Sequence, residues 1–129
     1  MAVTATPVFP QAIKSTVTQI NSATNTTIFT AGTNGSKVDA IGIASAGTNL
    51  TIKLYVGAIA NIIAWVTVPT NSGVAVTVPT FDLLRHANVS YLSIDAYGNK
   101  CMYLEAGQYI GINTPDTSVV TVVVQGADF

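Results

Sequence analysis

Two side chains in the sequence are of the types that nucleophilic catalysis uses, a thiol and an imidazole. The chain holds one cysteine, Cys101, and one histidine, His86. A carboxylate such as Asp95 or Asp39 could orient the imidazole so that it removes the thiol proton. However, Cys101 lies in KCMYL, which predicts a strand, and buried cysteines behave as small hydrophobic residues. We therefore expect a core cysteine, a half-exposed histidine and no enzyme activity.

A glycine-rich stretch, AGTNGSK at residues 31–37, invites comparison with a phosphate-binding loop. Such a loop needs the spacing GxxxxGK followed by Ser or Thr, and then a helix whose N-terminus faces the phosphate. Here only two residues separate Gly32 from Gly35, and the residues after Lys37 predict a strand. Asn34-Gly35 favours the tight turn of a hairpin, because both residues tolerate positive φ. We interpret the stretch as a corner between two strands.

The remaining candidates for site chemistry are scattered along the chain. One His and one Cys cannot supply a structural zinc site, and the six acids do not cluster as a calcium loop requires, so we expect no metal and no cofactor. Spacing alone leaves a carboxylate pair for glycoside cleavage open. Aromatic side chains could form a glycan-binding platform, although cross-strand packing is their default role. The aromatic residues in question are Tyr55, Trp65, Tyr91, Tyr97, Tyr103 and Tyr109.

Charge is the unusual feature of the composition. Only 9% of residues are charged, against about a quarter in an average domain, and 49% are hydrophobic. Free monomers usually rely on surface charge for solubility. This balance predicts a subunit covered by its neighbours, the alternative being a free protein whose polar surface is uncharged. The five Lys and Arg residues form no cluster, so we expect no nucleic-acid partner. The apolar run GAIANIIAWVTV is about 12 residues long, too short for a membrane helix, so we expect no membrane partner.

Short runs rich in Val, Ile, Thr and Tyr, separated by Gly, Asn and Pro, predict an all-β chain of eight or nine strands. Period-two alternation is clearest in LTIKLYV, where every second residue is apolar. An antiparallel β-sandwich with jelly-roll connections is the expected architecture, and a Greek-key sandwich is the alternative. The predicted strands include 13–20, 26–30, 37–45, 50–56, 62–68, 74–78 and 118–124.

One stretch, residues 80–88, predicts at most two turns of helix, capped by Thr80 and ended by Asn88. The last third is expected to be hairpin-like, with a corner at AYGNK, and the chain is expected to close with the strand at 118–124 before a tail, QGADF. The strand at 62–68 contains the lone tryptophan, and its nearly all-apolar sequence predicts a strand that is covered on both faces or meets another subunit.

The chain is expected to begin with an extended arm, residues 1–12, before a single β-sandwich domain at residues 13–129. Pro7 and Pro10 flank Phe9, and prolines at both places disfavour a helix and favour an extended path. MAVTATPVFPQ has no basic start and no unbroken apolar core, so it does not read as a signal peptide. We expect Pro7, Phe9 and Pro10 to form interface contacts with a partner.

Three stretches carry a resemblance to a known family: TATPVFPQ, TAGTNGSKVDAI, and the run DAYGNKCMYLEAGQYIGI together with the end VVVQGADF. Together they resemble small virion structural proteins of tailed bacteriophages, of the capsid decoration or cement type. The resemblance implies a jelly-roll-like sandwich that stabilises the head through protein–protein contacts. It also implies synthesis in the host cytoplasm and a location on the capsid surface.

The partners that the resemblance implies are the major capsid protein and copies of the chain itself, as a dimer or trimer. The alternative is a head-fibre, tail or receptor-binding module of the virion that binds a glycan. Long apolar strands such as 62–68 and 119–124 would aggregate at an open sheet edge, so we expect partner subunits to cover the edges.

Overall fold

The computed structural model describes residues 12–45, 50–89, 92–94, 97–115 and 119–129. This part of the chain holds ten strands and one short 3-10 helix, η1. In chain order the elements are β1 (Ala12–Ile20), β2 (Asn25–Thr30), β3 (Ser36–Ser45), β4 (Leu50–Val56), β5 (Ile62–Val68), β6 (Phe81–Asp82), η1 (Leu83–Arg85), β7 (Ser93–Ile94), β8 (Lys100–Leu104), β9 (Tyr109–Asn113) and β10 (Val120–Asp128).

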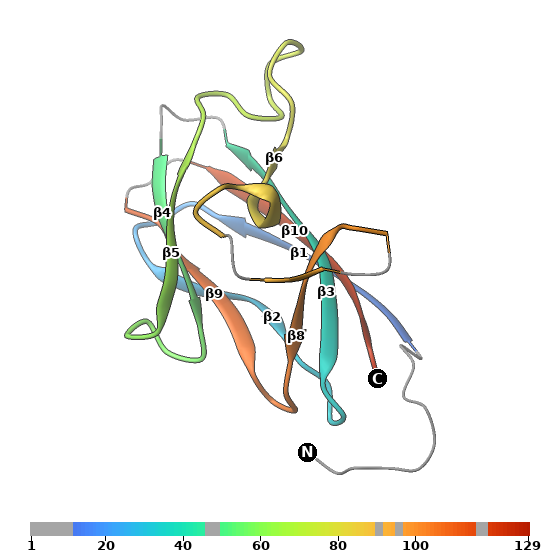
Figure 1. The fold of residues 1–129 in the computed structure, drawn as a ribbon. Helices are drawn as coiled ribbons and strands as arrows, with labels where there is room; N and C mark the ends of the chain where they lie inside the picture. Colours follow the sequence, from blue (N-terminus) through green and yellow to red (C-terminus); the bar gives the residue numbers. More distant parts are fainter. Residues whose placement is uncertain (1–11, 46–49, 90–91, 95–96, 116–118) are drawn as a thin grey trace.

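The strands form two antiparallel sheets, shown in Figure 1. Sheet A has the order β1-β10-β3-β8-β7, with β6 also paired to β3, and sheet B has the order β2-β9-β4-β5. The prediction of an all-β antiparallel β-sandwich is confirmed. The arm predicted at residues 1–12 lies outside the described residues up to residue 11, and Ala12 already belongs to β1.

The inner faces of the sheets supply the core because side chains alternate across each strand. In β4, Leu50, Ile52 and Leu54 are buried, as the alternation predicted. Sheet A contributes every second residue of β10 and the aliphatic residues of β3, of which Ile41 and Ile43 are wholly buried. An aliphatic core of this kind holds the sheets together through buried apolar area.

Strand β5 was expected either to be covered on both faces or to meet another subunit. The rest of the chain covers only one of its faces. Ala64, Val66 and Val68 are buried, whereas Trp65 is 54% exposed on the outer face. β5 is also an edge strand of sheet B. The alternative, an outer face that meets another subunit, stays a prediction.

The strand predicted at 74–78 is wrong. Asn71 and Gly73 have positive φ and reverse the chain, and the backbone N–H groups of Val74 and Ala75 donate to the Asn71 carbonyl oxygen. These local hydrogen bonds satisfy the backbone without a partner strand, so the β propensity of the valines is overridden. The loop projects from the upper end of the sandwich in Figure 1, and Val76 on it is fully exposed.

The corner at AGTNGSK is confirmed, but the hairpin predicted for Asn34-Gly35 is wrong. Gly35 has a φ of 87° and its N–H donates to the Gly32 carbonyl oxygen, as a tight turn requires. The flanking strands do not pair with each other, since β2 pairs with β9 and β3 pairs with β10 and β8. The turn therefore carries the chain from one sheet to the other.

Within the described part of the last third, β7 and β8 pair antiparallel on either side of the predicted corner AYGNK, as a hairpin requires. The next turn, between β8 and β9, again crosses between the sheets. The C-terminal strand was predicted too short: β10 continues to Asp128 through a bulge at Gln125/Gly126. A Cβ on Gly126 would lie 2.1 Å from the Lys37 carbonyl oxygen, so this glycine permits the close approach of β3.

The prediction of at most two helical turns within residues 80–88 is confirmed, but the predicted capping residues, Thr80 and Asn88, are wrong. The helix η1 has three residues and is preceded by Asp82, whose side chain makes no capping hydrogen bond. Asn88 lies beyond the helix end and donates its side-chain amide to the Trp65 carbonyl oxygen. The described residues contain no helix with the length and apolar character needed to cross a bilayer.

Gly111 in β9 provides a test of this packing. A Cβ at this position would lie 2.2 Å from Cζ of the buried Tyr55 ring on the neighbouring strand β4. We expect Gly111→Ala to lower the free energy of unfolding by about 1–3 kcal/mol through overpacking, measured by urea unfolding. Gly42→Ala is the control, because its Cβ would meet Thr80 Cγ2 at an ordinary 3.5 Å. Equal losses in the two variants would contradict this packing.

Candidate interaction surface

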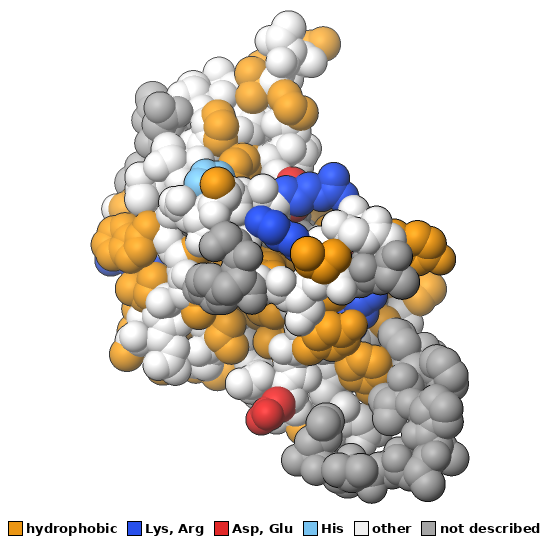
Figure 2. Space-filling model, in the orientation of Figure 1, with side chains coloured by type: hydrophobic (Ala, Val, Ile, Leu, Met, Phe, Trp, Pro, Cys, Tyr) orange, Lys and Arg blue, Asp and Glu red, His pale blue; other side chains and the backbone are white. Residues whose placement is uncertain are grey.

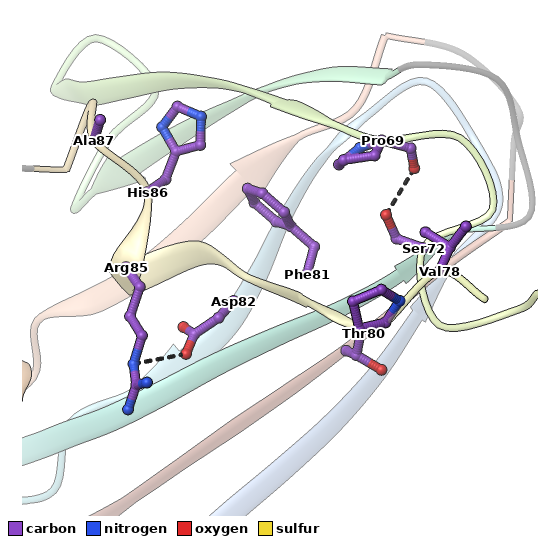
Figure 3. Close-up of a pocket in the computed structure, with 10 residues that line it drawn as sticks. Pro69, Ser72, Val78, Thr80, Phe81, Asp82, Arg85, His86 and Ala87 are labelled. Atoms are coloured by element: carbon purple, nitrogen blue, oxygen red, sulfur yellow. Dashed lines mark hydrogen bonds and ion pairs between the residues drawn. The ribbon is translucent and has the colours of Figure 1, made fainter. Parts of the chain in front are cut away.

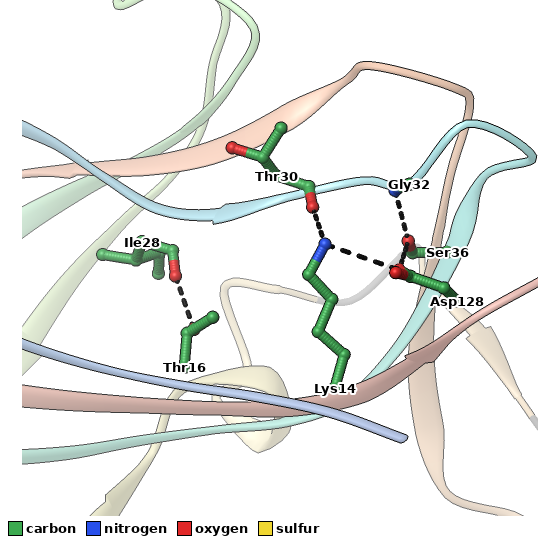
Figure 4. A network of polar contacts seen from close by, with 7 residues as sticks. All are labelled: Lys14, Thr16, Ile28, Thr30, Gly32, Ser36 and Asp128. Carbon is green, nitrogen blue, oxygen red and sulfur yellow. Dashed lines mark hydrogen bonds and ion pairs between the residues drawn. The ribbon is translucent and has the colours of Figure 1, made fainter. Parts of the chain in front are cut away.

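A polar network joins the first strand, β1, to the last strand, β10, at one corner of the sandwich, shown in Figure 4. Asp128, in the last strand, accepts a hydrogen bond from the Ser36 hydroxyl and lies 3.5 Å from Lys14 Nζ in the first strand. The Ser36 hydroxyl in turn accepts the Gly32 N–H at 3.0 Å. Lys14 also donates to the Thr30 carbonyl oxygen. The network ties β1, β2, β3 and β10 together.

This network shows what the glycine-rich corner does. The Gly32 N–H, which a phosphate would need, already donates to Ser36. A Cβ on Gly32 would lie 2.9 Å from Asp128 Cγ, so the absence of a side chain at this position leaves room for the carboxylate. A carboxylate of the same chain occupies the place where an anionic ligand would bind, and the corner therefore has a structural role.

The Ser36 hydroxyl lowers the pKa of Asp128 below its ordinary value, because it donates a hydrogen bond to the charged form. Lys14 acts in the same direction through its positive charge, while partial desolvation opposes both. Sequence reasoning missed Lys14, Ser36 and Asp128 as a group. Ser36 and Asp128 are 92 positions apart, and no local motif marks the contact.

A hollow of about 500 Å³ lies at the base of the projecting loop, shown in Figure 3. Its apolar wall includes Pro69, Val78 and Phe81, and its polar wall holds Asp82 and His86. Arg85 Nε lies 3.2 Å from Asp82 Oδ2 and neutralises that carboxylate. The Ser72 hydroxyl, which also lines the hollow, donates to the Pro69 carbonyl oxygen. Of the two candidate catalytic side chains, the hollow is lined by His86 but not by Cys101.

The structure does not place Cys101 and His86 in a catalytic pair. Cys101 is wholly buried in β8, as expected for a core cysteine. His86 is half-buried after η1, where its Nδ1 accepts the backbone N–H of Asn88 and its ring packs 5.7 Å from that of Phe81. The imidazole is therefore held by its own loop.

The acidic residues that the structure describes are not assembled into a site. No group of three or more His, Cys, Asp or Glu side chains that could hold a metal occurs among the described residues. Asp39 lies 3.1 Å from Lys37 Nζ, and this contact is the main cause of a raised pKa of Lys37. Asp95 and Asp116 lie outside the described residues.

All five Lys and Arg residues fall in the described part of the chain, and each is engaged by that chain. Lys14, Lys37 and Arg85 pair with aspartates. The ammonium group of Lys53 lies 4.5 Å from the centroid of the Trp65 ring, and Lys100 donates to the Val89 carbonyl oxygen at 2.7 Å. Each cationic group therefore has a contact within its own chain, although the Arg85 side chain is 68% exposed.

The aromatic residues form no single platform. Trp65 lies on the outer face of sheet B, whereas Tyr103 belongs to β8 of sheet A and stacks on Phe129. Tyr55 is buried, which raises its pKa through desolvation. Tyr97 is exposed in the turn before β8, and Tyr91 lies outside the described residues.

The surface instead presents large apolar side chains among neutral polar ones. Figure 2 shows apolar side chains spread over one face, with Lys and Arg side chains near its centre. Exposed apolar side chains scattered over a monomer are ordinary. Together with so few charged residues, they form a surface suited to contact with another protein. The most exposed large hydrophobic residues are Ile13, Val17, Trp65, Val74, Val76, Ile94, Tyr97 and Tyr103.

The interface residues predicted from the sequence, Pro7, Phe9 and Pro10, lie outside the described residues. Their role stays a prediction. The described surface adds candidates that the sequence alone did not single out, above all Ile13 and Val17 on β1 and Val76 on the projecting loop. Period-two alternation could have indicated the exposed face of β1, but it could not tell which face of the strand meets the core.

Comparison with known proteins assigns no family. No family model matches the chain, and no curated protein matches it. Among solved structures, a chain of the cyanophage Pam1 capsid asymmetric unit matches with a TM-score of 0.46 and 15% sequence identity. The match covers 99% of this chain and 94% of that chain. A likeness at this level establishes neither a family nor a function.

The corner network makes a prediction about pH. Because the pKa of Asp128 is lowered by folding, its carboxylate stabilises the protein above the unfolded-state pKa, and this contribution is lost as pH falls through the folded-state pKa. We expect Asp128→Asn to cost about 1 kcal/mol at neutral pH and progressively less as pH falls below about 4. Urea unfolding of both proteins across this range measures the difference.

Asp39→Asn is the matched control, since Asp39 contacts Lys37 at a half-exposed site and takes no part in the corner network. It is expected to change stability by less than about 0.5 kcal/mol. A cost of Asp128→Asn that stays constant down to acidic pH would show that the carboxylate charge is not what holds the corner.

Proposed function

We propose that this chain is a structural protein of a phage virion, attached to the head as a capsid cement or decoration protein. The observation that carries the proposal is a surface of almost no net charge that exposes large apolar side chains, with each of the five cations in contact with its own chain. Such a surface recognises a partner by shape and apolar contact. The sequence resemblance to virion proteins supports the same role.

The topology supports a jelly-roll connection of the sandwich. The four longest strands of sheet A lie in the order β1-β10-β3-β8, and the four strands of sheet B lie in the order β2-β9-β4-β5. Successive strands therefore alternate between the sheets at both ends of the chain, which is the arrangement that two interlocked Greek keys produce. We infer a jelly roll, with β6 and β7 as short additions.

The proposed mechanism is mechanical and involves no catalysis. Each copy adds buried contact area across a joint between capsid subunits, and the lattice repeats that contact many times. The sandwich supplies a rigid body because its core is aliphatic and its first and last strands are tied by the Lys14–Asp128 pair. The major capsid protein is the proposed partner.

The alternative, a head-fibre, tail or receptor-binding module, differs in copy number. Quantitative mass spectrometry of purified particles measures the ratio of this chain to the major capsid protein. The cement role predicts on the order of hundreds of copies per particle, because the sites follow the symmetry of the head. A handful of copies would instead support the fibre, tail or glycan-binding role.

The neutral surface predicts attachment that is insensitive to salt. Ion pairs between exposed groups weaken as salt screens them, whereas apolar contacts do not. We expect the dissociation constant for stripped particles to change by less than about threefold between 50 and 500 mM NaCl, measured by co-sedimentation. A loss of affinity above tenfold over this range would contradict attachment through neutral contacts.

The predicted arm gives a second test of attachment. Removing residues 1–11 leaves β1 intact, so the variant is expected to unfold at the same urea concentration as the full chain. The lost contacts of Pro7, Phe9 and Pro10 should weaken particle binding by at least about tenfold. Phe9→Ala in the full chain serves as the milder variant. Unchanged particle binding by both variants would exclude the arm as an attachment element.

A further inference from the structure

Three of the four sheet edges in the described structure are protected against pairing with another chain. At β2, the Thr16 hydroxyl donates to the Ile28 carbonyl oxygen at 2.7 Å, and Lys14 donates to the Thr30 carbonyl oxygen (Figure 4). At β5, the side-chain amide of Asn88 donates to the Trp65 carbonyl oxygen at 2.8 Å. At the edge of sheet A opposite β1, the strand β7 has only two residues. Side-chain caps and short strands are the usual protection of edges.

The remaining edge, β1, has none of these devices. β1 is nine residues long and pairs with β10 in an unbroken register without a bulge. It contains no proline, and its one charged residue, Lys14, points toward the Asp128 corner. Its outward side chains are Ile13, Ser15, Val17 and Gln19, of which Ile13 is 95% and Val17 69% exposed. A nine-residue edge without proline, bulge or outward-facing charge is a template for strand addition.

We propose that β1 pairs antiparallel with β1 of a second copy of this chain, about a two-fold axis, so that sheet A continues across a dimer. A second copy fits because the strand is self-complementary. Antiparallel pairing about a two-fold axis places each residue opposite another of the same strand, and no like charges meet. The contact closes on itself, which removes the open edge that would otherwise aggregate.

The register of this pair follows from the pleat. Side chains directly opposite each other lie on the same face of a sheet, so paired residue numbers must be both odd or both even. The register that uses all nine residues places Thr16 opposite Thr16 of the other copy. Ser15 then faces Val17 of the other copy, and Ile13 faces Gln19. Within each copy, Val17 lies opposite Val123 of the neighbouring strand β10.

The dimer does not depend on the proposed function, because the edge is a property of the isolated chain. Sedimentation equilibrium of the full chain measures it directly. We expect a dimer at about 100 µM protein. Val17→Lys places a charge on the outer face beside the junction and should weaken the dimer at least tenfold. A monomeric wild-type chain at this concentration would overturn the proposal and leave particle attachment untouched.

Val76→Lys is the control, since it makes the same substitution at another exposed valine, on the projecting loop. It is expected to remain dimeric. Circular dichroism and urea unfolding of both variants separate loss of pairing from loss of folding. Loss of the dimer in Val76→Lys, or its persistence in a folded Val17→Lys, would place the contact elsewhere and overturn the proposal.

A cross-link tests the register independently. In the proposed dimer, residues 15 and 17 of opposite copies are direct neighbours, and antiparallel neighbours have Cα separations of about 4.5–5.5 Å, within the range for a disulfide. Ser15→Cys/Val17→Cys should therefore form a covalent dimer on mild oxidation, seen on non-reducing gels. Ser15→Cys/Gln19→Cys, whose cysteines are not opposite each other, should not. Equal cross-linking of the two variants would contradict the register.

Discussion

The scarcity of charge, and its use inside the molecule, is the constraint on which the rest of the structure depends. Three of the five cations are held by aspartates, one by an indole ring and one by a backbone carbonyl oxygen. The Lys14–Asp128 pair joins β1 to β10 and the Lys53–Trp65 contact joins β4 to β5, whereas the Lys37–Asp39 and Arg85–Asp82 pairs are local. With so few charged residues, the proposed partner contact rests mainly on shape, apolar area and hydrogen bonds to neutral groups.

The alternation of side chains made much of the sandwich predictable from the sequence. β4 and β5 have the predicted bounds, because period-two patterning and flanking turn residues agree there. The strand predicted at 74–78 failed because positive φ at Asn71 and Gly73 closed local turns, and their hydrogen bonds replaced those that a partner strand would supply. The choice of partner strand also failed at Asn34-Gly35, since a turn residue specifies a reversal and not the sheet that receives it.

The candidate site was less predictable than the fold. The corner network joins Lys14, Ser36 and Asp128, which sequence separation conceals and only the pairing of β1, β10 and β3 brings together. The hollow beside η1 likewise depends on where the projecting loop folds back. The absence of a catalytic signature was a sequence-based expectation, and the described residues bring no thiol and imidazole into contact.

The edges connect the fold to the proposed role. A sandwich always has strands at the rims of its sheets, and an assembly protein can use a rim or must protect it. Here the corner between β1 and β2 does both: side chains of β1 cap the carbonyl groups of β2, while the outer edge of β1 stays available. Stability of the single chain and association with others thus draw on the same strand.

A cryo-EM reconstruction of the intact particle tests the central claim most directly. The account predicts β-sandwich density repeated over the head surface by the capsid symmetry, in contact with capsid subunits through neutral side chains. Density for this chain confined to a tail or fibre, or contacts dominated by ion pairs, would contradict it.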